Sequence, residues 1–201
     1  MYINNKKLVA ILIISIFVFS INKAFAAKSE NRDKNLYRFN DYTQIINPLI
    51  SAGLSGQENS KGLGHFMLIY SQSAAITHTG KFIGSTNKWK IGKRPSEENK
   101  QAKYDGMPSG HINAAWFAAS YVRTFTQEYK YIAIPLYITA AASGFSLVKS
   151  KQNTVLQVVS SAAIAEIVNI VNKKLAWSNQ YRSISLNLSR SGGSLGIKIK
   201  L

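Results

Sequence analysis

The stretch KYDGMPSGHINAAW, residues 103–116, decides the fold, because it joins a Pro-Ser-Gly turn to the start of an alanine-rich helix. Ser109 stands where a helix N-cap is expected, and Gly110 lets the backbone come close to a ligand. The free amide groups of a first helical turn carry partial positive charge and can hold an anion. His111 in that turn can donate a proton, because imidazole titrates near neutral pH. The stretch by itself is also typical of an ordinary capped helix.

Outward from this stretch, the sequence predicts an all-α domain over residues 41–182. Runs of apolar and small residues predict helices over 41–54, 63–82, 109–125, 129–148 and 154–177. Asp41 can cap the first helix, and Pro48 should kink it or end it. The polar residues 83–107 predict a long exposed loop, and the polar residues 27–40 predict a flexible leader.

Two further segments depart from the pattern of the helical core. The uncharged run between Lys130 and Lys149 is close to the shortest length that can span a membrane. Its proline, glycine, threonine and serines favour a buried helix of an all-α core instead. The tail 183–201 alternates apolar and polar residues on both sides of Gly192-Gly193, which predicts a β-hairpin outside that core.

The amino terminus has the pattern of a secretory signal peptide. Lys6 and Lys7 precede the mostly apolar run 8–21, and Ala24-Phe25-Ala26 is a typical cleavage site. We therefore predict that residues 1–26 are a signal peptide and that the protein is exported to the periplasm or cell envelope. Retention of this segment as an uncleaved anchor is the alternative.

The chain is strongly basic. Its 201 residues carry a formal charge of +16, and loss of residues 1–26 with their three lysines leaves +13. Such a charge favours an anionic partner, which we expect to be a phosphorylated small molecule or lipid, or an anionic membrane surface. The basic residues form no arginine-rich tract, so we expect no nucleic acid. The absence of cysteine from the sequence excludes disulfides and thiolate chemistry.

Two motifs together resemble the type-2 phosphatidic acid phosphatase superfamily, which includes bacterial acid phosphatases and vanadium haloperoxidases. They are Arg94-Pro95 in the long loop and Pro108-Ser109-Gly110-His111 at the head of a helix. The resemblance covers most of residues 40–200. It implies a helical bundle in which Arg94, Ser109 and Gly110 bind phosphate and His111 protonates the leaving group.

The first and third motifs of that superfamily are incomplete in this chain. The first motif has a lysine seven residues before its arginine, where Asn87 stands, and Lys88 or Lys81 could take its place. The third motif is Ser-Arg, five residues, His, three residues, Asp. It aligns without gaps from Ser146, which puts Leu147, Asn153 and Gln157 at the arginine, histidine and aspartate positions.

These replacements bear directly on catalysis. The resemblance makes the third-motif histidine the nucleophile that attacks phosphorus, whereas an asparagine amide has no available lone pair. Replacement by His65 or His78 is the other possibility for a nucleophile, and Lys149 and Lys151 could return positive charge lost at Leu147. We therefore expect an exported phosphatase-like protein that binds phosphorylated envelope ligands with impaired or absent hydrolysis, and we expect no cofactor or metal.

Two alternatives stay open at this point. One is an active phosphatase on lipid phosphates or pyrophosphates with an altered nucleophile. The other is a non-catalytic envelope protein that uses its tail and basic surface to bind a partner.

Overall fold

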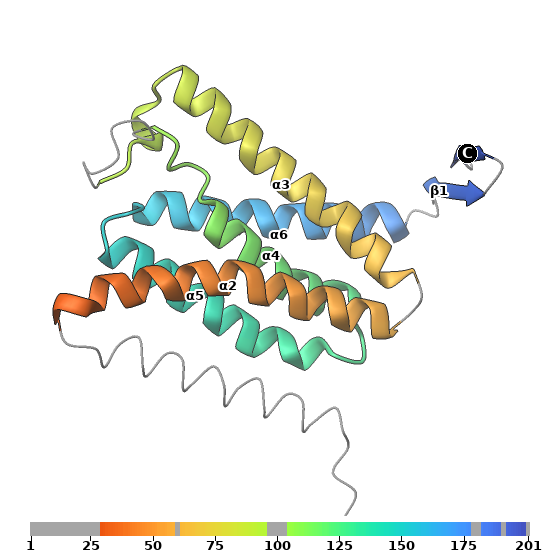
Figure 1. The fold of residues 1–201 in the computed structure, drawn as a ribbon, viewed down its shortest axis with the longest axis horizontal. Helices are drawn as coiled ribbons and strands as arrows, with labels where there is room; N and C mark the ends of the chain where they lie inside the picture. Colours follow the sequence, from red (N-terminus) through yellow and green to blue (C-terminus); the bar gives the residue numbers. More distant parts are fainter. Residues whose placement is uncertain (1–28, 59–60, 96–103, 178–181, 190–191, 200–201) are drawn as a thin grey trace, which may run out of the picture.

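The computed structural model describes residues 29–58, 61–95, 104–177, 182–189 and 192–199 (Figure 1). Its α-helices are α2 (Ser29–Glu58), α3 (Gly62–Thr86), α4 (Gly110–Phe125), α5 (Ala133–Lys149) and α6 (Val155–Trp177), with short 3-10 helices η1 (Lys90–Gly92) and η2 (Lys130–Ile132). The prediction of an all-α domain is confirmed for this helical part. The predicted signal peptide, residues 1–26, lies outside the described residues.

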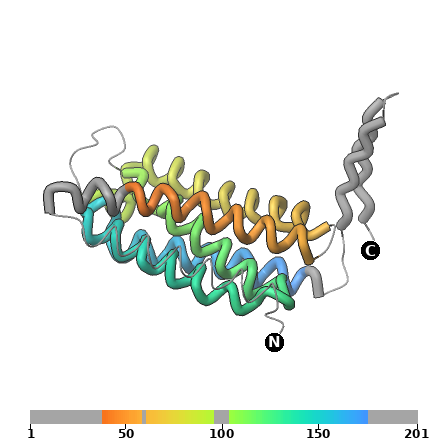
Figure 2. The backbone as a smooth tube through the Cα atoms, turned by 60° about the horizontal axis from the view of Figure 1, so that its bottom comes forward, coloured from red at the N-terminus to blue at the C-terminus, as the bar shows by residue number. Residues whose placement is uncertain are grey.

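Helix α4 lies at the centre of the bundle, between the four longer helices (Figures 1 and 2). Its Ile112, Ala115, Phe117, Ala118 and Val122 are completely buried. Alanine favours a helix and is small enough for neighbouring helices to approach closely. The alanine-rich run that follows the quoted turn therefore forms the core around which the other helices pack.

An aromatic cluster joins α4 to α3 and α6. The ring of Phe66 on α3 packs edge-to-face against Tyr121 of α4 at 5.0 Å between centroids, and against Phe117 at 5.9 Å. Ala165 and Val168 of α6 complete the cluster. Burial of large rings is the main favourable contribution that a small bundle can obtain from packing.

Polar side chains tie the remaining helix interfaces together. Asn47 of α2 donates its side-chain amide to Thr139 Oγ1 of α5 at 2.6 Å and to the carbonyl of Leu136 at 3.2 Å. Ser51 donates to the carbonyl of Ala118 on α4 at 3.0 Å. The bundle interior is thus partly polar, with several of its amides and hydroxyls paired across helices.

Helix α2 corrects two expectations. It begins at Ser29 rather than Asp41, so the prediction of a flexible leader over 27–40 is wrong from Ser29 onward. Phe39 and Asn40 are 7% and 1% exposed, and Asn40 exchanges hydrogen bonds with Ser143 and Ser146 of α5. These contacts order a segment whose sequence lacks an apolar period. The helix also continues through Pro48 to Glu58.

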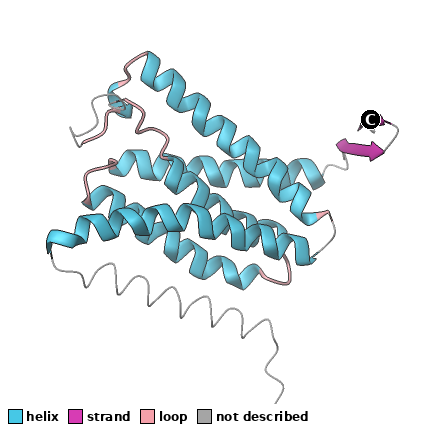
Figure 3. Ribbon diagram, in the orientation of Figure 1, coloured by secondary structure: helices cyan, strands magenta, loops and turns pink. Residues whose placement is uncertain are grey.

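The segment after α3 also differs from the expected long exposed loop. Helix α3 continues to Thr86, η1 follows, and Gly92 and Gly106 are buried and joined by a backbone hydrogen bond of 2.9 Å. Loops and turns of the described residues lie at the two ends of the bundle (Figure 3). The predicted helices 109–125, 129–148 and 154–177 agree with α4, α5 and α6.

At the carboxyl end, β1 (Arg182–Ser189) and β2 (Gly192–Ile199) pair in an antiparallel register with Leu186 opposite Leu195. The helices define the fold class, and the hairpin tail stays a prediction.

Candidate anion-binding site

The candidate site lies near one end of the bundle, which we call the site end. At the site end, the start of α4 lies near the end of α3, the loop that follows α3, and the turn between α5 and α6 (Figure 1). Antiparallel neighbours bring these termini together although they are far apart in sequence.

Ser109 occupies the N-cap position of α4 with extended backbone, φ −73° and ψ 118°, but its hydroxyl makes no capping hydrogen bond. The expectation of a serine cap is therefore wrong for its side chain. Its backbone N–H donates to Ser161 Oγ on α6, and its carbonyl accepts from the N–H of Asn113 at 3.0 Å. The Ser109 side chain is buried, and its Oγ has no hydrogen-bond partner among the described residues. The start of α4 thus holds a buried hydroxyl that lacks a hydrogen bond, which is an unfavourable arrangement for a polar group.

Lys81 reaches this helix start from α3. A β-carbon added to Gly110 would lie 3.6 Å from Lys81 Nζ, an ordinary van der Waals distance, so the ammonium group lies directly beside the helix start. Burial lowers the pKa of Lys81, while Asp105 raises it and Arg94 lowers it. The lysine is thus partly desolvated and lies within electrostatic range of both charged neighbours.

Arg94 is held by an ion pair with Asp105, with 2.7 Å between Arg94 Nε and Asp105 Oδ1. This pairing uses the Nε–H and leaves the terminal nitrogens of the guanidinium for a second acceptor. Lys81, Arg94 and the start of α4 therefore present positive charge at one place, with the carboxylate of Asp105 paired to Arg94. We call Lys81, Arg94 and Asp105 the cationic cluster.

The structure distinguishes the three candidates for the first-motif lysine. The side chain of Asn87 donates to the carbonyl of Ile83 at 2.9 Å and caps the end of α3. Lys88 is exposed and takes a left-handed backbone conformation with φ 50°. Only Lys81 among the three approaches the start of α4, so the cluster contains a lysine that the motif spacing does not predict.

His111 is paired with a residue that sequence reasoning missed as a site residue. Its Nε2 lies 3.0 Å from Oδ1 of Asp41 on α2, and both side chains are partly exposed. Asp41 was expected only to cap a helix, and 70 residues separate the two in the chain. Only the tertiary packing of α2 against α4 brings them together.

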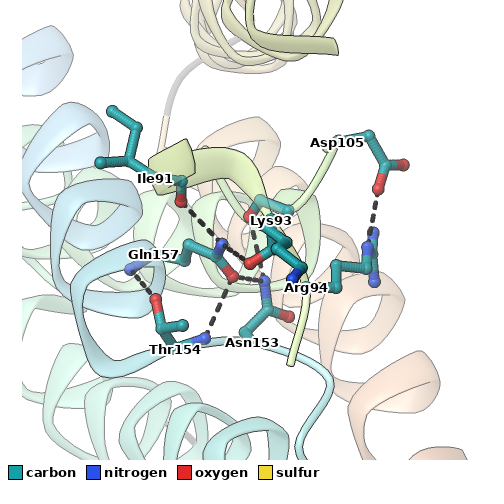
Figure 4. A network of polar contacts seen from close by, with 8 residues as sticks. Ile91, Lys93, Arg94, Asp105, Asn153, Thr154 and Gln157 are labelled. Carbon is teal, nitrogen blue, oxygen red and sulfur yellow. Dashed lines mark hydrogen bonds and ion pairs between the residues drawn. The ribbon is translucent and has the colours of Figure 1, made fainter. Parts of the chain in front are cut away.

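The third-motif positions form a buried clasp rather than an open catalytic pair (Figure 4). Asn153 and Gln157 are 3% and 0% exposed. Asn153 donates to the carbonyl of Gly106 and to Oε1 of Gln157, each at 3.0 Å. Gln157 Nε2 donates to the carbonyls of Ile91 at 2.8 Å and Lys93 at 3.0 Å. We call Asn153 and Gln157 the amide clasp.

The amide clasp holds the two chain segments that carry the charged residues of the site. Lys93 immediately precedes Arg94, and Gly106 immediately follows Asp105. By fixing the carbonyls of Lys93 and Gly106, the clasp fixes the backbone on which the Arg94–Asp105 ion pair is built. Asn153 and Gln157 are therefore positioning residues in this structure.

The other proposed replacements are not at the cluster. Leu147 is 1% exposed, and its carbonyl accepts the backbone N–H of Gln152 at 3.0 Å. Lys149 and Lys151 are exposed at the turn after α5. His65 pairs with the hydroxyl of Tyr121 at 2.8 Å near the opposite end of the bundle.

His78 is exposed on α3. A hollow of about 580 Å³ lies at the end of the bundle opposite the candidate site and does not belong to that site. It is lined by Arg123, Thr124, Ile170, Lys173 and Lys174.

No protein-family model, curated protein or solved structure matches the chain at a significant level. The resemblance to the phosphatase superfamily therefore rests on the motif residues and not on any match along the whole chain.

Proposed function

We propose that this is an envelope protein that binds a phosphorylated small molecule or lipid at the cationic cluster, with impaired or absent hydrolysis. The observation that carries the proposal is the approach of Lys81 to Gly110 at the start of α4, next to the Arg94–Asp105 ion pair. Export, suggested by the amino-terminal pattern, is part of the same proposal.

The chemistry of the cluster favours a phosphate. A guanidinium group binds two oxygens of one phosphate, and a helix N-terminus offers free N–H groups to a third. Burial lowers the pKa of Lys81, because desolvation disfavours its charged form. A bound anion would offset this cost of desolvation. Ser109 adds an unpartnered hydroxyl at the same helix start, although its Oγ has no exposed surface in this structure.

The amide clasp is the reason to expect poor hydrolysis. A side-chain amide cannot attack phosphorus, and the amide of Asn153 is already bonded to Gly106 and Gln157. Loss of a covalent nucleophile costs on the order of 10⁶ in turnover, which leaves only the effects of binding and positioning.

The Asp41–His111 pair favours a second candidate function, which is hydrolysis with an altered nucleophile. A carboxylate bonded to one ring nitrogen orients an imidazole and fixes which nitrogen can face a substrate. With Nε2 on Asp41, the Nδ1 atom of His111 is the nitrogen left for a substrate. This reading requires phosphate release that His111→Ala and Asp41→Asn both abolish.

Binding of inorganic phosphate by the full chain in detergent, followed by isothermal titration calorimetry, tests the proposal. Because charge-assisted hydrogen bonds contribute about 1.5–3 kcal/mol, we expect Arg94→Ala and Lys81→Met each to weaken binding about 10-fold to 100-fold. Lys88→Met is the matched control, because it removes an exposed lysine of the same region. Equal affinity of all four proteins would refute the site.

Phosphate release from phosphomonoesters and lipid pyrophosphates, measured on the natural chain, His111→Ala and Asp41→Asn, separates the two functions. We expect the natural chain to bind without turnover. Turnover that disappears in His111→Ala would instead establish the phosphatase reading.

A further inference from the structure

The outer surface of the helical bundle is apolar. Large aliphatic side chains on the outward faces of the four helices around α4 are about half exposed or more. They include Leu49 of α2 at 66%, Met67 of α3 at 54%, Ile138 of α5 at 54%, and Val159 and Ile167 of α6, each at 58%. We call these exposed apolar side chains of α2, α3, α5 and α6 the apolar belt. A water-soluble helix normally presents charged and polar residues on this face.

Helix α6 has polar side chains on its buried face and apolar side chains on its outer face, the reverse of a water-soluble helix. Its buried face carries Gln157, Ser161 and Asn169, all 0% exposed, whereas Val159 and Ile167 face outward. Helix α5 behaves alike, because Thr139 and Ser143 are buried while Ile138 is exposed. Hydrogen-bonding groups inside and hydrocarbon outside is the arrangement expected for helices surrounded by lipid.

Long stretches of α2, α3 and α5 carry no charged residue. No Asp, Glu, Lys or Arg occurs within 42–57 of α2, 62–80 of α3 or 131–148 across η2 and α5. Helix α6 carries a single charge in its middle, Glu166, which bonds to Trp116 and Ser120 of α4 at 2.9 Å each. An ionisable residue within a membrane normally faces the interior of its bundle in this way.

The lengths of α3 and α6 fit a bilayer, whereas α4 and α5, with 16 and 17 residues, are shorter than its hydrocarbon thickness. Helices α3 and α6 have 25 and 23 residues. At about 1.5 Å per residue these lengths exceed the ~30 Å hydrocarbon thickness. Among the described residues, Lys130–Lys149 and Val155–Leu175 also reach the hydropathy of membrane spans, and the second is only 28% buried within the bundle. The turns after α3, α4 and α5 all lie at the bundle ends (Figure 3), so irregular backbone stays out of the middle.

We propose that the helical core is embedded in a lipid bilayer and that the apolar belt contacts its hydrocarbon. The apolar side chains lie on four helices around α4 rather than on one face (Figures 1 and 2). A second copy of the chain would cover one patch and leave the rest in water, whereas lipid covers all of them. The occupant is therefore hydrocarbon, and the protein is integral to the membrane.

One consequence rests on the proposed function. The cationic cluster lies at the site end, next to the charged ends of α2, α3 and α5, and these charges mark the level of the lipid headgroups. A phosphate on a membrane lipid would reach Lys81 and Arg94 there without leaving the bilayer.

Because the sequence contains no cysteine, single cysteines can be introduced for spin labelling of the full chain in phosphatidylcholine vesicles. Leu49→Cys, Ile138→Cys and Ile167→Cys report on the belt. Lys88→Cys, Lys149→Cys and Lys174→Cys report on the two ends, and Ala118→Cys reports on the interior. We expect belt labels to collide severalfold more with oxygen, which dissolves in hydrocarbon, and severalfold less with a water-soluble nickel chelate, than end labels do.

Two results would overturn the proposal. Belt labels that collide with the nickel chelate as often as the end labels do would show a water-exposed domain, even if residues 1–26 anchor it. Belt labels as inaccessible to both reagents as the label at Ala118→Cys would show a protein interface instead. Neither readout depends on phosphate binding, so the two proposals can fail separately.

Discussion

Replacement of Gln157 by glutamate tests the amide clasp most directly. The change keeps the side-chain size and the Oε1 acceptor, which receives Asn153 Nδ2 and the N–H of Thr154 at 3.0 Å each. It removes the Nε2 donor that holds the carbonyls of Ile91 and Lys93. A carboxylate oxygen would then face two carbonyl oxygens in a fully buried place.

The expected cost follows from the two carbonyls that lose their donor. A buried group left without its partner costs about 1–3 kcal/mol, so Gln157→Glu should lower the free energy of unfolding by about 4 kcal/mol at pH 7. Burial and repulsion raise the pKa of the new carboxyl above its unfolded value of about 4.3. The unfolded state then holds fewer protons than the folded state, and the loss of stability grows as the pH rises above about 4.

Unfolding by graded additions of dodecyl sulfate to mixed micelles, followed by circular dichroism at pH 4 and pH 7, measures both effects. Gln152→Glu is the matched control, because it makes the same chemical change at a partly exposed side chain. A Gln157→Glu variant within about 1 kcal/mol of the natural chain at pH 7 would refute the clasp, since even one unpaired carbonyl costs that much.

Four more perturbations have expected outcomes. Lys81→Met should be at least as stable as the natural chain at pH 7, because burial lowers the pKa of Lys81 in the folded state. This advantage in stability should shrink as the pH rises toward about 10.4, the pKa of an unfolded lysine. A variant that is less stable than the natural chain at neutral pH would contradict this. Phosphate at ten times its dissociation constant should stabilise the natural chain by about 1.4 kcal/mol in the same unfolding experiment and Lys81→Met by less. Gly144→Ala should destabilise by about 1–3 kcal/mol, because its β-carbon would lie 2.8 Å from Val158 Cγ1; unchanged unfolding would mean that α5 and α6 can separate without cost. Glu166→Ala should lower the unfolding midpoint more than Glu128→Ala, an exposed control, because it leaves several donors of α4 and α5 unpaired.

The sequence predicts the helices well where uncharged apolar and small residues run without breakers, as in α4, α5 and α6. It fails at the start of α2, because residues 29–40 have no apolar period and are ordered by contacts such as that of Asn40 with α5. The motif residues Arg94 and Ser109 do lie near the same helix start. Lys81 was only one of three candidates for the first-motif lysine, and Asp41 was expected only to cap a helix, because spacing along the chain does not show which helix ends meet in space.

The polarity of the outer surface was also beyond sequence reasoning. Pro135, Thr139 and Ser143 within the run 131–148 favoured a buried helix in an all-α core. The structure shows that these residues do face inward, while Ile134 and Ile138 between them face outward at 63% and 54% exposure. The composition of the segment does not show which side chains face inward and which face outward. That difference appears only when α5 packs against α4 and α2.

The carboxylate of Glu166 bears on the order in which the chain is assembled. Its donors Trp116, Ser120 and Arg123 belong to α4, and Tyr137 belongs to α5. A ribosome makes all four before it makes α6, so the partners of Glu166 already exist when that residue emerges. Helix α6 can therefore pack into the bundle with the carboxylate of Glu166, its one central charge, already able to bond to α4 and α5. In a chain that made α6 before α4, these donors would not yet exist.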